Sequence, residues 1–233
     1  MPFEPSFAGV QAAPVVDRAT FIRRTYLYLA GALGLFTVLC AAFVSSGLGV
    51  VMIKALSKTS YSWLLVLGAF MLVVKLATHL SENAASNSTQ AIGLGLYVLA
   101  EALIFAPLLT LAYMVDPTIV PTAGLLTLML TGGLTYTAFS TKSDFSFLAP
   151  ILAIGSLVAL GVIVCSVLFG FTLGIVFSGA MLLLAGGMIL FDTSRIIRDY
   201  PADRPAGAAL HLFASVALLF WYVVRILMQL QRR

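Results

Sequence analysis

Apolar residues follow one another in long runs along this chain, without the regular alternation of apolar and polar positions that is typical of a strand. Seven runs are about 20 residues long or longer, which is the length a helix needs to cross the hydrocarbon core of a bilayer. They cover residues 24–46, 61–80, 91–114, 119–140, 147–168, 173–193 and 206–229. Because an open sheet would leave backbone groups unpaired in lipid, the pattern predicts seven transmembrane helices and no barrel.

The segments between the runs are short and leave no room for a soluble domain. Residues 1–19 have mixed polarity and include prolines, so we interpret them as a flexible N-terminal tail, and residues 20–233 as one seven-helix transmembrane domain. Asp116 precedes a proline and should end the third run, since that position disfavours helical backbone. The tight turn at residues 169–172 predicts that the fifth and sixth spans are antiparallel neighbours.

The composition supports a membrane protein. Hydrophobic residues make up 61% of the chain and charged residues 9%, whereas soluble domains have about 45–50% and about 25%. This excludes an ordinary soluble globule and also a disordered chain, which would be more polar. The two cysteines, Cys40 and Cys165, lie in apolar runs. We interpret them as buried apolar side chains and not as redox groups or metal ligands.

The basic residues indicate an orientation. Most of the 13 Lys and Arg side chains fall on the cytoplasmic side if the N-terminus lies inside, so we predict a cytoplasmic N-terminus. The net charge of +4 is spread over loops and chain ends. No basic stripe with interleaved aromatic residues is present, so we expect the lipid bilayer as a partner and no nucleic acid.

Glu101 lies near the middle of the third span. An ionisable group there costs about 2.5–3.5 kcal/mol on insertion and is therefore a functional candidate. Pro107 follows and cannot donate a hydrogen bond to the carbonyl of Leu103, which favours a kink. Two interpretations remain open: a pathway acid along a pore or proton route, and a packing acid that is hydrogen-bonded to a neighbouring helix.

The sixth and seventh spans carry the other candidates. Asp192 lies in the sixth span, with Arg195 three residues later on the same face as a possible ion-pair partner. His211 and Ser215 lie one turn apart in the seventh span. Because a short turn joins these spans, we expect His211 and Ser215 to be cross-helix neighbours of Asp192, and a carboxylate facing an imidazole would titrate in the physiological range. The alternatives are a helix-end ion pair for Asp192 and a histidine bonded to a carbonyl. Lys75 is close enough to the end of the second span to reach the interface.

The motifs of enzymes are missing. The sequence contains no HExxH, CxxC or GxSxG. Ser215 and His211 share one helix, so they do not suit an intramembrane serine protease, and the last span has no lysine for a retinal Schiff base. We therefore predict that the protein is not an enzyme and has no cofactor. Calcium prefers clustered oxygen ligands, and the spans offer only Glu101 and Asp192, so we expect transient calcium and no stationary metal site.

Several stretches resemble the Bax inhibitor-1 (transmembrane Bax inhibitor motif) family. The segment TKSDFSFLAP after the fourth span is similar to a connecting segment of that family, and LFDTSRII resembles its signature around the acid of span six. GLGLYVLAEALIFAPLL in the third span and the ALHLF and LLFWYVVRIL stretches of the seventh also match. The resemblance covers nearly all of residues 20–230.

The resemblance implies an all-α membrane protein with one central helix surrounded by six others. Members of the family are described as pH-sensitive calcium-leak channels, whose closed state is held by two aspartates that share a proton. The first acid corresponds to Asp192. The position of the second is occupied by Ser215, which is a departure from the pair. A family arginine that pairs with the span-six acid has its candidate counterpart in Lys75.

Two functions follow from these implications. In the first, Asp192, His211 and Ser215 form a gate and pH sensor for passive cation (calcium) permeation. In the second, the protein does not conduct ions and instead binds and modulates a membrane-bound ATP-dependent protease or other membrane proteins. Bacterial members include a branch associated with such a protease, so we expect a multi-pass protein of the bacterial inner (plasma) membrane.

Overall fold

The computed structural model describes residues 17–58, 62–83, 86–141 and 144–231. Within these ranges the chain forms eight helices and no strand. They are α1 (Arg18–Ser45), α2 (Leu48–Leu56), α3 (Ser62–Asn83), α4 (Asn87–Val115), α5 (Ile119–Ser140), α6 (Leu148–Phe169), α7 (Ile175–Arg198) and α8 (Pro205–Gln231). Seven of these are long and apolar enough to cross a membrane, which confirms the predicted all-α, seven-span fold.

The helices extend beyond the predicted apolar runs at several ends. Helix α1 begins at Arg18, where the Asp17 side chain accepts a hydrogen bond from the amide of Ala19 at 3.3 Å. Residues 18 and 19 of the predicted tail thus belong to this helix, while residues 1–16 lie outside the described part. Helix α3 continues to Asn83, three residues beyond the predicted apolar run of residues 61–80.

The short helix α2 was not predicted, because its apolar run is too short to cross a bilayer. It begins after Gly47, whose φ of 77° lies in the left-handed region that glycine adopts without strain. Helix α2 packs on α4. A Cβ at Gly49 would lie 2.7 Å from the carbonyl oxygen of Ala106 and would collide with Thr110, so glycine permits this close contact.

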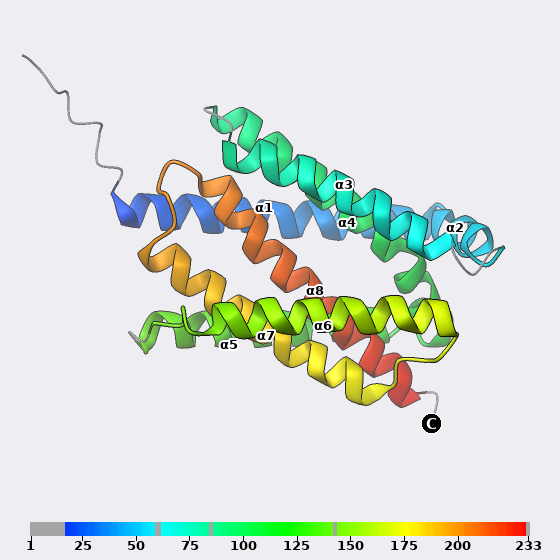
Figure 1. Ribbon diagram of the computed structural model, residues 1–233. Coiled ribbons are helices and arrows are strands. Elements are labelled where there is room, and N and C mark those ends of the chain that lie inside the picture. Colours follow the sequence, from blue (N-terminus) through cyan, green and yellow to red (C-terminus); the bar gives the residue numbers. More distant parts are fainter. Residues whose placement is uncertain (1–16, 59–61, 84–85, 142–143, 232–233) are drawn as a thin grey trace, which may run out of the picture.

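Helix α8 is the central helix. It packs against α1, α3, α4, α5 and α7, while α6 packs on α7 at the outside of the bundle (Figure 1). Aromatic rings fill the contact between α8 and its neighbours. The ring centroid of Phe213 lies 5.6 Å from that of Phe36 and 6.0 Å from that of Tyr97. The ring centroids of Trp221 and Phe105 are 5.0 Å apart. The core of the protein therefore lies along α8.

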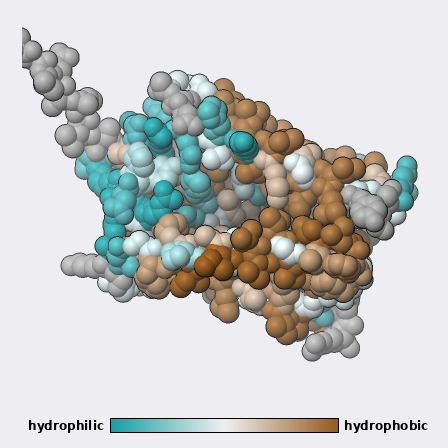
Figure 2. Space-filling model, viewed as in Figure 1, coloured by the Kyte–Doolittle hydropathy of each residue, from teal (hydrophilic) through white to brown (hydrophobic). Residues whose placement is uncertain are grey.

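The outer surface is largely apolar. Large apolar side chains on α6 and α7 are exposed, such as Leu157 at 71% and Val176 at 84%, as expected for helices that face lipid. Hydrophilic side chains gather at one end of the molecule, where α7 turns into α8 (Figure 2).

Cys40 is buried as expected, but Cys165 is exposed on α6, so the interpretation of Cys165 as a buried residue was wrong. It belongs to the face of α6 that points away from the bundle.

Asp116 ends α4, as the following proline predicted. Its carboxylate accepts hydrogen bonds from the amide and hydroxyl of Thr118, both at 2.7 Å, and from Gln231 Nε2 at 2.8 Å. These donors stabilise the charged form and hold the pKa of Asp116 below its usual value. The Gln231 contact also ties the end of α8 to the turn between α4 and α5.

Candidate functional site

Asp192 and Ser215 meet across the contact between α7 and α8. The Ser215 hydroxyl donates a hydrogen bond to Asp192 Oδ2 at 2.6 Å, and the Ser215 Oγ also lies 3.2 Å from the carbonyl oxygen of His211. A length of 2.6 Å is typical of an O–H group bonded to a carboxylate. Ser215 is buried and Asp192 is partly buried. The short turn between the two helices brings these residues to one depth.

The His211 ring has a different partner from the one expected. Its Nε2 lies 2.6 Å from Oε1 of Glu82, in the last turn of α3, and the structure gives no direct hydrogen bond between the ring and Asp192. Both side chains of the Glu82–His211 pair are about one-third exposed. Sequence reasoning missed Glu82 because it lies just beyond the apolar run of residues 61–80. Its acidic side chain at the end of an apolar run was the available signal.

Tyr200 lies beside this pair, with its ring centroid 6.2 Å from that of His211. Burial, together with the charge of Glu82, raises the pKa of Tyr200 to about 12. The Arg195 guanidinium lies over the rings of Phe191 and Tyr200, at 5.5 and 5.4 Å, and makes no ion pair with Asp192 among the described residues. The structure therefore does not join Arg195 to Asp192, although the two share a helix.

The end of α7 has a basic partner that sequence reasoning missed. Arg18 in α1 donates hydrogen bonds to the carbonyl oxygens of Ile197 at 3.0 Å, Tyr200 at 2.5 Å and Arg195 at 3.2 Å. The carbonyls of Arg195 and Ile197 belong to the last turn of α7, and that of Tyr200 lies just beyond its end, where backbone acceptors have few partners within the helix. Lys75, the other possible ion-pair partner, lies exposed on α3. The structure records no ion pair between it and Asp192.

Glu101 is buried in α4, with 9% of its surface exposed. The Tyr97 hydroxyl, one turn earlier in the same helix, donates a hydrogen bond to its Oε1 at 2.9 Å. The bond therefore forms within α4 and not with a neighbouring helix. The sequence analysis did not identify Tyr97 as a partner of Glu101. The two residues are four positions apart, and this spacing brings them together only in a helix.

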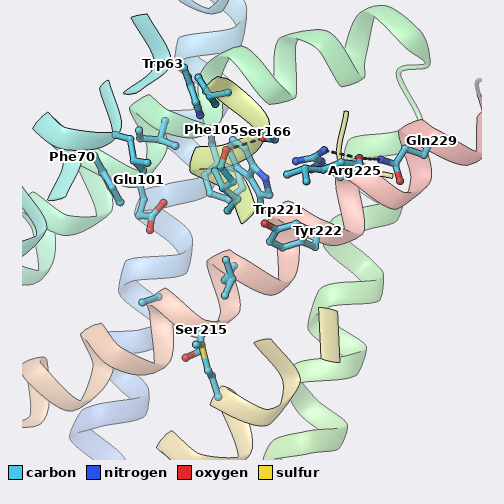
Figure 3. Close-up of a pocket in the computed structure, with 18 of the residues that line it drawn as sticks. Trp63, Phe70, Glu101, Phe105, Ser166, Ser215, Trp221, Tyr222, Arg225 and Gln229 are labelled. Atoms are coloured by element: carbon cyan, nitrogen blue, oxygen red, sulfur yellow. Dashed lines mark hydrogen bonds between the residues drawn. The ribbon is translucent and has the colours of Figure 1, made fainter. Parts of the chain in front are cut away.

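Glu101 and Ser215 both line one cavity of about 710 Å³ between α3, α4, α6, α7 and α8. Figure 3 shows Glu101 on one side of this cavity and Ser215 at its base. Asp192 lies behind Ser215 and is linked to it by the hydrogen bond described above. The cavity therefore connects the two acids that the sequence indicated, one directly and the other through a hydroxyl.

The opposite side of the cavity is closed by a polar contact near the end of α8 (Figure 3). Arg225 and Gln229 donate hydrogen bonds to the carbonyl oxygen of Leu173 in the α6–α7 turn, at 3.4 and 3.3 Å. The Arg225 guanidinium also lies 6.0 Å from the centre of the Tyr222 ring. Thus the cavity has one acidic and one basic side chain in its wall, on opposite sides.

Seven apolar helices with α8 at their centre, and with acids inside the bundle, define a multi-pass membrane protein with a polar site between its helices. Over residues 18–232 the chain matches the family model described as inhibitor of apoptosis-promoting Bax1. The chain therefore belongs to the Bax inhibitor-1 family, as the resemblance predicted.

Two plant relatives are similar to part of the chain. A BI1-like protein of Arabidopsis thaliana is 37% identical over 123 residues, which are 50% of this chain and 47% of that protein. Protein LIFEGUARD 1 of Arabidopsis thaliana is 36% identical over 108 residues, or 44% of this chain and 46% of that protein. The chain thus spans about half the length of the curated relatives it matches.

Proposed function

We propose that this protein is a pathway for passive cation permeation, with calcium as the ion, and that protonation around Asp192 controls its opening. The observation that carries the proposal is the hydrogen bond from Ser215 to Asp192, which joins α7 to α8 at the base of a cavity that also contains Glu101. Ionisable side chains inside a membrane bundle commonly mark ion or proton pathways.

The proposed gate depends on the charge of one carboxyl. An O–H group bonds a carboxylate roughly twice as strongly as it bonds a neutral acceptor. When Asp192 takes up a proton, its bond to Ser215 weakens, and the contact between α7 and α8 beside the cavity loosens. Acidification therefore favours opening. The oxygens of Glu101 and Ser215 offer weak, transient ligands to calcium, in keeping with its preference for oxygen.

A calcium-flux assay tests this proposal. The purified protein is reconstituted into liposomes that contain a calcium indicator, and flux is measured from roughly pH 6 to pH 8. We expect flux above that of empty liposomes, increasing at lower pH. Asp192→Asn should remove the pH dependence, because the amide does not titrate there. Asp199→Asn, which changes an exposed acid at the end of the same helix, should keep it.

Two results would contradict the proposal. Flux equal to that of empty liposomes at every pH would show that the protein is not a channel. An unchanged pH profile in Asp192→Asn would show that Asp192 is not the pH sensor.

The proposed setting is a bacterial inner membrane with a cytoplasmic N-terminus, which the distribution of Lys and Arg supports. A reporter fused to the N-terminus and probed from each side of the membrane measures this orientation.

One observation favours a second candidate function. The structure has Ser215 beside Asp192, where the family resemblance implies a second acid, so a proton-sharing pair of carboxyls is missing. A protein without that pair could act through contacts with other membrane proteins, such as a membrane-bound ATP-dependent protease. Co-purification of that protease with the wild-type chain, combined with the absence of calcium flux, would support this alternative.

A further inference from the structure

We propose that the cavity beside α4 and α8 binds lipophilic organic cations, and that Glu101 supplies the negative charge. The inference does not depend on calcium permeation, because it concerns equilibrium binding to a preformed site. Its basis is the combination of an aromatic lining, one buried carboxyl and an opening at the apolar surface of the bundle.

Aromatic rings from three helices form much of the lining. Trp63 and Phe70 come from α3, Tyr97 and Phe105 from α4, and Trp221 from α8. Figure 3 shows Trp63, Phe70, Phe105 and Trp221 around the same cavity as Glu101. The faces of such rings attract cations, and most strongly when the cation is desolvated. An organic cation with an apolar body would also bury its surface against these rings.

Among the residues that the structure describes, none forms an ion pair with Glu101. The Tyr97 hydroxyl bonds its Oε1, and within the described ranges no basic side chain contacts either oxygen. A carboxylate in an apolar wall is unfavourable unless a positive group offsets its charge. A bound cation would provide that group without any rearrangement of the bundle.

The cavity is accessible from the side of the bundle. Helices α3 and α6 both contribute to its wall, but α3 packs on α2, α4 and α8 whereas α6 packs on α7. The surface is hollowed between them, within a largely apolar region (Figure 2). A lipophilic solute dissolved in the membrane can therefore reach the site. The volume of about 710 Å³ falls in the range of about 300–1,000 Å³ that drug-sized ligands occupy.

Arg225 is the other charged residue of the lining and would favour an anion instead. The ring contacts of Tyr97 with Phe213 and of Phe105 with Trp221 show that α4 and α8 run in the same direction. Along this register Arg225 lies two turns beyond the level of Glu101, or about 12 Å. Arg225 already contacts Tyr222 and the Leu173 carbonyl near the end of α8. Glu101, which is buried among the rings, should therefore decide the sign of the ligand.

Two ions of the same shape and opposite charge provide the test. The chain contains two tryptophans, Trp63 and Trp221, and both line this cavity. Tryptophan fluorescence of the full chain in lipid nanodiscs is titrated with tetraphenylphosphonium and, separately, with tetraphenylborate, and empty nanodiscs correct for partition into lipid. We expect a saturable change with the cation only. Glu101→Gln should weaken its binding roughly tenfold or more, because the charge is lost while the shape is kept.

Three control variants separate the role of Glu101 from a loss of folding. Asp199→Asn, which changes an exposed acid that does not line the cavity, should leave cation binding unchanged. Phe70→Leu should weaken cation binding while Glu101 stays intact, and it tests the site if Glu101→Gln does not fold. Arg225→Gln should not weaken it. Equal binding of both ions, preferential binding of tetraphenylborate, or undiminished cation binding by folded Glu101→Gln would overturn the proposal.

Discussion

The contact between Asp192 and Ser215 is the smallest unit on which the proposed function depends. One hydroxyl hydrogen serves the Asp192 carboxylate at 2.6 Å, with the His211 carbonyl as a second, longer acceptor at 3.2 Å. A serine can donate this bond at any physiological pH. A second carboxyl at the same place could not remain ionised beside the first at such a distance, because two like charges would repel each other strongly.

Exchanging this residue therefore tests what the departure from the family pattern means. We expect Ser215→Asp to make calcium flux more strongly pH-dependent than in Ser215→Asn, because only the acid creates a pair that shares a proton. The asparagine is the matched control, since it has nearly the same shape and no titrating group. The measurement is the same liposome assay across roughly pH 6–8. Superimposable pH profiles for the two variants would contradict this expectation.

Between elements, close approach of α3 and α4 depends on one glycine. A Cβ at Gly93 would lie 2.7 Å from the carbonyl oxygen of Ala77 and 2.8 Å from the amide nitrogen of Ser81, and would also collide with the Ser81 hydroxyl. Nothing lies within 4 Å of the corresponding position at Gly95, two residues later. Small residues that admit a neighbouring backbone are a main source of helix packing in lipid.

Alanine at these two positions should affect stability differently. Gly93→Ala should destabilise the protein by about 1–3 kcal/mol, because it overpacks a contact with backbone atoms that cannot move aside. Gly95→Ala should be neutral or slightly stabilising, since alanine favours the helix by up to about 1 kcal/mol over glycine. Thermal unfolding of both variants in detergent measures the difference. If both melt at the same temperature, the close approach at Gly93 has no energetic weight.

At the scale of the whole molecule, the hydrophilic end holds together helices that are distant in sequence. Arg18 joins α1 to the last turn of α7, and the Glu82–His211 pair joins α3 to α8. Gln90 in α4 donates a hydrogen bond to the carbonyl oxygen of Asp203 at 3.1 Å. The opposite end is tied by the contact from Gln231 to Asp116. The apolar lengths of the helices pack between these polar contacts.

Loss of Arg18 should loosen this end of the bundle. Arg18→Gln removes most of the donors to three carbonyls of one helix end, and hydrogen bonds from charged groups contribute about 1.5–3 kcal/mol. Because the site is partly exposed, we expect a smaller destabilisation of about 1–2 kcal/mol. Arg23→Gln, an exposed position on the same helix, is the control and should change little. Thermal melts compare the two, and equal melting temperatures would show that the Arg18 contacts do not stabilise the protein.

The sequence by itself determined the class of protein and much of its layout. The length of the apolar runs set the number of spans, because a bilayer of fixed thickness demands a fixed helix length. The short turn before Pro205 also placed Ser215 at the level of Asp192, since antiparallel helices joined by a tight turn share depth over their adjoining lengths.

Only the tertiary structure decided which side chains face each other between helices that are not consecutive. Depth alone made His211 a neighbour of Asp192, but the rotation of α8 directs its ring to Glu82 on α3. Arg195 likewise lies on aromatic rings and not against the acid three residues before it. The aromatic cavity at Glu101 could not be predicted either. The hydropathy pattern indicates the depth of a residue in the membrane. The rotation of each helix, and therefore which side chains contact each other, depends on packing among residues far apart in the chain.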